Sequence, residues 1–203
     1  AMELVIEDWY VIKRLAELGL DKERLLRVRN VAIDAARSND TNHHAANAYG
    51  THAYQSGIWA LRHQFADEDW DVCRKNGVET IFNADLNLSI GFCNVDLCCD
   101  DNAGPKPRSD KKSGSERTAN LSLFDSLPHY SPPPAPSAHA ALYYLMMDIN
   151  GAAELTRPVI ANGTFANWVE RIYLSDGNDL ETEFSEFEND DQTDVYDPIV
   201  SRK

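Results

Sequence analysis

One carboxylate and two histidines are the residues whose type and position best suit catalysis. Asp96 stands in an apolar run that predicts a strand, and His44 and His52 lie in or just before a predicted helix. A strand carboxylate that lines a cleft can act as a general base or a metal ligand, with a histidine taking part in proton transfer. Asp96, His44 and His52 are therefore candidate catalytic residues. The alternative is a solvated strand face with surface or packing histidines.

No metal site and no cofactor is predicted. His44 and His52 are eight residues apart, about two helical turns, which is too far along the axis to share an ion directly. The four cysteines form no C-x-x-C pair, the spacing usual in zinc sites. No secretory leader is recognised, so we expect reduced thiols in a cytoplasmic protein. The phosphate-loop, dinucleotide-binding and nucleophile-elbow motifs are absent from the sequence.

A basic segment follows the strand that carries Asp96. Residues 101–118 hold five bases and three acids among glycines, serines and prolines. Positive charge on a chain of small residues suits the clamping of a nucleotide or nucleic-acid phosphate. The alternative is a solvated excursion that rests on the acidic end of the chain. The candidate phosphate- or ligand-binding residues are Lys106, Arg108, Lys111, Lys112 and Arg117.

The chain as a whole is acidic, and most of the excess lies at its C-terminal end. Its 203 residues include 33 acids and 19 bases, a net charge of −14, and residues 175–203 alone hold ten of the acids and two of the bases. This balance argues against nucleic-acid binding over the whole surface and against anionic membranes. The same balance favours binding to a basic protein surface, because dense carboxylates imitate a phosphate backbone. The predicted partner-binding residues are Glu181, Glu183, Phe184, Glu186, Phe187, Glu188, Asp190 and Asp191.

Two functions follow from these features. The preferred one is an acidic interaction protein, an inhibitor or adaptor that binds a basic protein, with nucleic-acid-binding proteins as the natural partner class. The alternative is an enzyme that acts on a nucleotide or nucleic-acid phosphate, held by residues 106–117 and processed by Asp96 with His44 or His52. No membrane partner is expected, since no apolar run reaches the roughly 18 residues of a membrane helix.

Three helices are predicted before residue 66. Apolar residues from Val11 to Leu18 recur at helical spacing, Asp21 can cap a second helix, and Thr41 can cap a third that runs to about Phe65. Small residues line one seam of the third helix and let another backbone approach closely. This seam predicts packing within the chain, with a homodimer as the alternative. Its members are Ala46, Gly50, Ala53, Gly57 and Ala60.

The rest of the chain predicts strands. Asn-Gly occurs at 76–77, 150–151 and 162–163, and this pair between extended segments is a strong hairpin signal. The implied registers place Arg74 opposite Glu79 and Glu154 opposite Arg171. Residues 141–149, 152–161 and 164–174 are expected to form a three-stranded meander, although 138–149 and 164–174 also fit helices. Residues 88–99 predict a further strand.

The predicted fold is therefore α+β, with N-terminal helices packed on a mainly antiparallel sheet of about six strands with Asn-Gly hairpins. Residues 2–66 form the helical part and residues 67–174 the sheet part of one domain. Residues 100–118 are expected to be a mobile basic loop and residues 128–137 an extended proline-rich segment. Residues 175–203 are expected to be an acidic, disordered tail.

Overall fold

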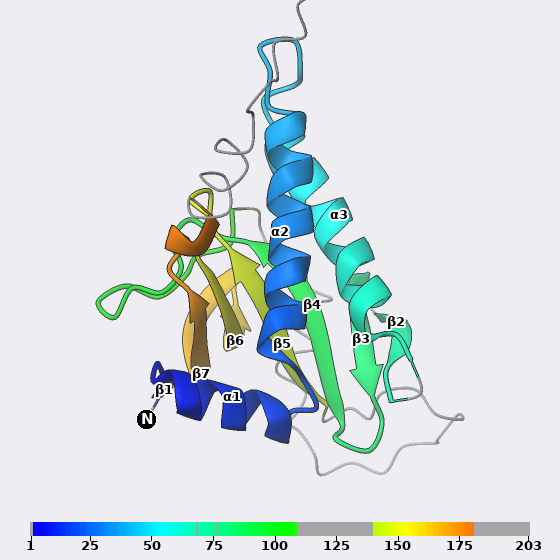
Figure 1. Cartoon of the computed structure of the whole chain (residues 1–203), viewed down its shortest axis with the longest axis vertical. Coiled ribbons are helices and arrows are strands. Elements are labelled where there is room, and N and C mark those ends of the chain that lie inside the picture. Colours follow the sequence, from blue (N-terminus) through cyan, green and yellow to red (C-terminus); the bar gives the residue numbers. More distant parts are fainter. Residues whose placement is uncertain (1, 68, 76, 109–139, 181–203) are drawn as a thin grey trace, which may run out of the picture.

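Three helices cover one face of a sheet in the computed structural model, which describes residues 2–67, 69–75, 77–108 and 140–180. The long helices α2 and α3 lie side by side and extend beyond one end of the sheet, while α1 crosses the opposite end (Figure 1). The α+β class is therefore confirmed. The helices are α1 (Asp8–Glu17), α2 (Lys22–Ser38) and α3 (Ala48–Phe65).

The sheet has seven strands instead of about six, in the order β1-β7-β6-β5-β4-β3-β2. It is mixed, because β1 pairs with β7 and β4 pairs with β5 in parallel, while the other pairs are antiparallel. A three-residue strand is too short to show alternation in a sequence, and a parallel pair carries no turn signal. The strands are β1 (Glu3–Val5), β2 (Asp71–Lys75), β3 (Val78–Asn83), β4 (Leu88–Asn94), β5 (Ala141–Met147), β6 (Ala153–Ala161) and β7 (Thr164–Ser175).

The helix signals are confirmed for α1 and α2 and are partly wrong for α3. The Asp21 side chain caps α2 by accepting a 2.8 Å hydrogen bond from the Arg24 backbone. α3 begins at Ala48 and not at Thr41, whose Oγ1 lies 2.7 Å from Nδ1 of His44 instead. Residues 41–47 are all exposed, so no apolar face holds them against the sheet as a helix.

The small residues of α3 face the sheet of the same chain. Ala53, Gly57 and Ala60 are buried, and a Cβ placed on Gly57 would lie 2.7 Å from the ring of Phe92 on β4. Gly57 therefore allows α3 to approach β4 closely. The predicted packing within the chain is therefore seen for these three residues, while Ala46 and Gly50, the other members of the seam offered as a homodimer face, are not buried.

The strand registers agree in part with those expected from charge pairing. Arg74 pairs with Glu79 and Val72 with Ile81, as predicted, while Asn76 lies outside the described residues. Asn162 and Gly163 both have positive φ between the paired Ala161 and Thr164. The expected two-residue turn at 150–151 is wrong, because Met147 pairs with Ala153 and leaves a five-residue connection.

The register of β6 against β7 shifts further along the strands. Irregularities at Arg157/Pro158 and at Val159/Ile160 place Arg171 opposite Thr156, not opposite Glu154 as predicted. The first irregularity falls at Pro158, which has no N–H to give to the ladder. The predicted opposite charges still meet, diagonally, as a buried ion pair between Glu154 Oε2 and Arg171 Nη2 at 2.7 Å.

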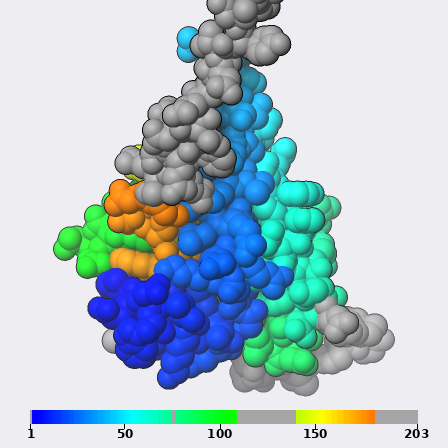
Figure 2. All heavy atoms as spheres, in the orientation of Figure 1, coloured from blue at the N-terminus to red at the C-terminus, as the bar shows by residue number. Residues whose placement is uncertain are grey.

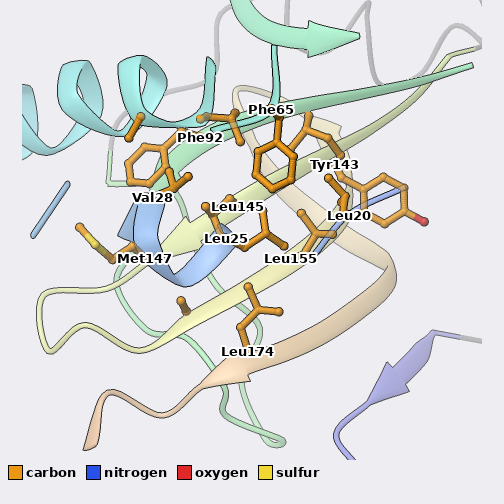
Figure 3. Packing of buried hydrophobic residues seen from close by; sticks show 14 of the residues in the cluster. Leu20, Leu25, Val28, Phe65, Phe92, Tyr143, Leu145, Met147, Leu155 and Leu174 are labelled. Atoms are coloured by element: carbon orange, nitrogen blue, oxygen red, sulfur yellow. The ribbon is translucent and has the colours of Figure 1, made fainter. Parts of the chain in front are cut away.

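Apolar side chains fill both faces of the sheet. Beneath the helices, residues of α2 and α3 pack on alternate residues of β4, β5, β6 and β7 (Figure 3). A smaller cluster on the other face includes Tyr144, Phe165 and Val95. The strand expected over 88–99 ends at Asn94, so Cys98 is buried against this second face instead of alternating outward.

The segment after β4 lies against the sheet. Glu154 accepts the backbone N–H of Cys99 at 2.8 Å, and the Arg171 guanidinium donates to the carbonyl of Asp100 at 2.9 Å. Val95 and Pro107 form an isolated antiparallel bridge. Residues 100–108, the described part of the expected mobile loop, are therefore fixed by hydrogen bonds, and the proline-rich 128–137 lies outside the described residues.

A buried arginine anchors the residues that follow β7. Arg29 of α2 is fully buried, donates to the carbonyl of Gly151 at 2.8 Å, and forms an ion pair with Asp179. Leu180 is buried in the helix-side core. Residues 176–180, which the sequence assigned to the acidic tail, thus belong to the packed fold, and 181–203 lie outside the described residues.

Candidate functional site

Asp96 occupies a structural position at the surface. Its Oδ1 accepts the backbone N–H of Leu97 at 2.8 Å and of Lys106 at 2.7 Å. These bonds hold the start of the basic segment against the end of β4. An exposed carboxylate that satisfies two backbone donors stabilises a turn, and neither His44 nor His52 is among its hydrogen-bond partners.

The two candidate histidines lie near each other at the start of α3. Their rings are 6.4 Å apart between centroids in an edge-on arrangement, and His44 is exposed. The structure therefore brings these two together but leaves Asp96 out of the pair. In the part of the chain that the structure describes, no three His, Cys, Asp or Glu side chains gather where a metal ion would need them.

Only two of the five candidate phosphate-binding bases lie in the described residues. Lys106 and Arg108 are both exposed, and the Arg108 backbone donates a 3.1 Å hydrogen bond to the carbonyl of Asn94. Lys111, Lys112 and Arg117 lie outside the described residues. The eight predicted partner-binding residues from Glu181 to Asp191 also lie outside them.

The described part of the chain is itself acidic. It contains 21 acidic and 14 basic residues, so its net charge is −7, half of the total. Several bases are already paired: Arg14 with Glu170, Arg29 with Asp179, and Arg171 with Glu154. The acidity that the sequence assigned mainly to the tail is therefore also a property of the folded part.

A groove between α1 and the start of α2 combines apolar walls with carboxylates. We call it the α1–α2 groove, and its volume is about 430 Å³. Asp8, Ile12 and Ala16 follow one another at four-residue spacing and so line one stripe of α1. The facing side comes from α2 and the turn before it. The lining residues are Asp8, Ile12, Ala16, Leu20, Asp21, Lys22, Glu23 and Leu26.

The rim of the α1–α2 groove is negatively charged. Its single base, Lys22, donates to Asp8 at 2.6 Å, so this charge is already paired. The Asp8 and Glu23 side chains are 70% and 86% exposed, which leaves both carboxylates accessible to a basic group. Glu23 is also 3.8 Å from Arg27, an exposed contact that water screens strongly.

Large apolar side chains are exposed beside this rim. Ile12 is 53% exposed within the groove, and Trp9, one turn earlier on α1, is 68% exposed and stacked on Tyr10. Figure 2 shows α1 and α2 as adjoining dark- and mid-blue surfaces on this face. A surface of exposed aliphatic and aromatic groups rimmed by carboxylates is typical of an interaction site.

Comparisons with family models, with curated proteins and with solved structures find no match. Within the described ranges, no helix is both long and apolar enough to cross a membrane. The α1–α2 groove could not be predicted from the sequence, because Asp8, Ile12 and Ala16 fit an ordinary amphipathic helix. The feature that distinguishes the groove is the exposure of Ile12, which only the structure shows.

Proposed function

We propose that this chain is an acidic interaction protein, an inhibitor or adaptor that binds a basic protein through the α1–α2 groove. The observation that carries the proposal is the combination of exposed Ile12 with the accessible carboxylates of Asp8 and Glu23 on one rim. An apolar floor supplies affinity and the acidic rim selects partners of positive charge.

The groove between two helices suits an amphipathic helical segment of the partner. Such a segment presents apolar residues at helical spacing, which fit between Ile12 and Leu26, and its lysines and arginines then face Asp8 and Glu23. Burying Ile12 contributes roughly 1–2 kcal/mol. Each exposed ion pair adds about 0.2–1 kcal/mol and weakens with salt. The acidic residues from Glu181 onward support the same partner class by steering encounter.

A designed peptide tests this groove. The probe is a helical 18-residue peptide with leucines along one face and lysines elsewhere, compared with a scrambled peptide of the same composition. We expect Ile12→Gln to weaken binding about tenfold, and Glu23→Gln about threefold at low salt. Val31→Gln and Asp34→Asn on α2 are matched controls, because both residues are exposed and lie outside the groove.

The proposal fails if the groove variants and their controls bind alike, or if the scrambled peptide binds as tightly as the helical one. Replacing Glu186, Glu188, Asp190 and Asp191 with amides in the full chain measures the contribution of the tail. We expect this variant to slow association at low salt with little change in dissociation.

The alternative function, an enzyme acting on a nucleotide or nucleic-acid phosphate, has one observation in its favour. Arg108, one of its predicted phosphate contacts, lines a second groove beside Asn94. The proposed catalytic role of Asp96 with His44 or His52 gains no such support. Of this hypothesis, the binding of a phosphate ligand at Arg108 is the part that the second groove supports.

A further inference from the structure

A second groove is lined by the start of α3 and the end of β4. We call it the α3 groove. Its volume is about 500 Å³, within the range of small-molecule sites. The first two turns of α3 line one side, and Cys93 and Asn94 of β4 line the other. Arg108 closes it from the segment after β4.

Asn94 lines this groove and holds a buried acceptor that the described residues leave without a partner. Its Nδ2 donates to the carbonyl of Gly50 at 2.8 Å, which fixes the orientation of the amide because a carbonyl only accepts. The opposite atom, Oδ1, is buried and has no hydrogen-bond partner among the described residues. A buried acceptor without a donor is costly, so a ligand N–H that reaches Oδ1 satisfies a group the fold leaves unpaired.

Arg108 brings a cation that forms no ion pair within the described part of the chain. Hydrogen bonds from Arg108 N to Asn94 O at 3.1 Å and from Asp96 N to Lys106 O at 3.0 Å fix the backbone on both sides of the Val95–Pro107 bridge. Its side chain is exposed, and no carboxylate of the described residues forms an ion pair with it. A guanidinium in this position is suited to a phosphate, which accepts two parallel hydrogen bonds.

Tyr49 and Tyr54 also line the α3 groove and supply flat apolar surfaces. Tyr49 is half-buried and its hydroxyl is 3.4 Å from the carbonyl of Ile149, while Tyr54 is 38% exposed. Burial raises the pKa of both hydroxyls, so they remain neutral donors at physiological pH. A planar heterocycle gains stacking and apolar contact on such rings.

We infer that the α3 groove binds a nucleoside monophosphate whose base carries an amino group. The phosphate lies on the Arg108 guanidinium, the base lies among the tyrosine rings, and its amino group donates to Oδ1 of Asn94. This ligand uses both groups that have no partner among residues 2–67, 69–75, 77–108 and 140–180, whereas inorganic phosphate uses only Arg108. The site is separate from the α1–α2 groove, so the two proposals stand or fall independently.

Calorimetry on the full chain with four related ligands tests the inference. Adenosine monophosphate is compared with inosine monophosphate, which lacks the amino group, with ribose 5-phosphate, which lacks the base, and with adenosine, which lacks the phosphate. We expect adenosine monophosphate to bind most tightly and each of the other three to bind at least fivefold more weakly.

Two matched variants locate the phosphate. Arg108→Gln is expected to weaken adenosine monophosphate at least tenfold and to leave adenosine binding unchanged. Lys106→Gln removes the same charge two residues earlier, outside the groove, and is expected to change binding less than twofold. Both side chains are exposed, so neither change threatens the fold.

Three results would overturn the inference. One is no heat with adenosine monophosphate at 10 mM, and another is ribose 5-phosphate binding as tightly as the nucleotide. The third is an equal loss in Arg108→Gln and Lys106→Gln, which would show only general attraction between phosphate and positive charge.

Discussion

Replacing either of two glycines of α3, Gly50 or Gly57, by alanine should change the free energy of unfolding in opposite directions. A Cβ on Gly57 would lie 2.7 Å from three ring atoms of Phe92, which is 1% exposed and held in the core. A Cβ on Gly50 would meet one atom, Nδ2 of Asn94, at 3.9 Å. Gly50 lies in the first turn of α3 and Gly57 in its middle, so each alanine gains helix propensity while the packing of the two sites differs.

The magnitudes follow from these distances. Overpacking a buried site costs about 1–3 kcal/mol, and replacing a helical glycine by alanine gains about 1 kcal/mol. We therefore expect Gly57→Ala to lower the free energy of unfolding by up to about 2 kcal/mol and Gly50→Ala to raise it by about 0.5–1 kcal/mol. A difference of about 2 kcal/mol corresponds to about 4–8 °C in Tm for a chain of this size.

Urea unfolding followed by circular dichroism at 222 nm measures both variants against the unchanged chain. Equal slopes with denaturant would show that the change lies in the native packing. The reasoning is refuted if Gly57→Ala is as stable as Gly50→Ala, because the helix would then not approach β4 as closely as described.

Two further predictions concern the buried charges. Arg171→Met should lower the free energy of unfolding by about 3–5 kcal/mol, because Glu154 remains buried without its cation. In urea unfolding, adding Glu154→Gln to this variant should recover at least half of the loss. If Arg171→Met alone is within about 1 kcal/mol of the unchanged chain, the prediction is contradicted. The hydrogen bond from Arg29 lowers the pKa of Asp179, so this carboxylate stabilises the fold above its unfolded pKa of about 3.9 and loses that contribution as the pH falls through its folded pKa. The Tm difference between the unchanged chain and Asp179→Asn should thus be constant from pH 7 to about pH 5 and shrink below about pH 4; a difference that persists at pH 2 would argue against the ion pair.

Local signals in the sequence predicted the elements well where charge and apolar spacing agreed. Asp21 caps α2 as expected, and Arg74 pairs with Glu79. The register of β6 was wrong because each irregularity changes which residues lie opposite without altering the apolar pattern. The ion pair between Glu154 and Arg171 was nevertheless found, since long side chains reach diagonally across a strand pair.

The candidate sites were harder to predict because they join distant segments. Asp96 resembled a catalytic carboxylate in an apolar run, yet β4 ends two residues earlier and its side chain stabilises a turn. The α3 groove brings Tyr49, Asn94 and Arg108 together from three elements. Each residue alone is ordinary, and the hydrogen bonds of Asn94 to Gly50 on one side and to Arg108 on the other hold the three segments together.

Because β1 pairs with β7, this edge of the sheet can form only after β7 has been synthesised. Glu3 of β1 lies beside Glu170 of β7, and Arg29 of α2 finds its partner at Asp179. The helices are synthesised before β7, so the part of their apolar surface that packs on β7 stays uncovered until that strand has been made. Contacts so distant along the chain slow folding, and we expect refolding to be limited by closure of this edge.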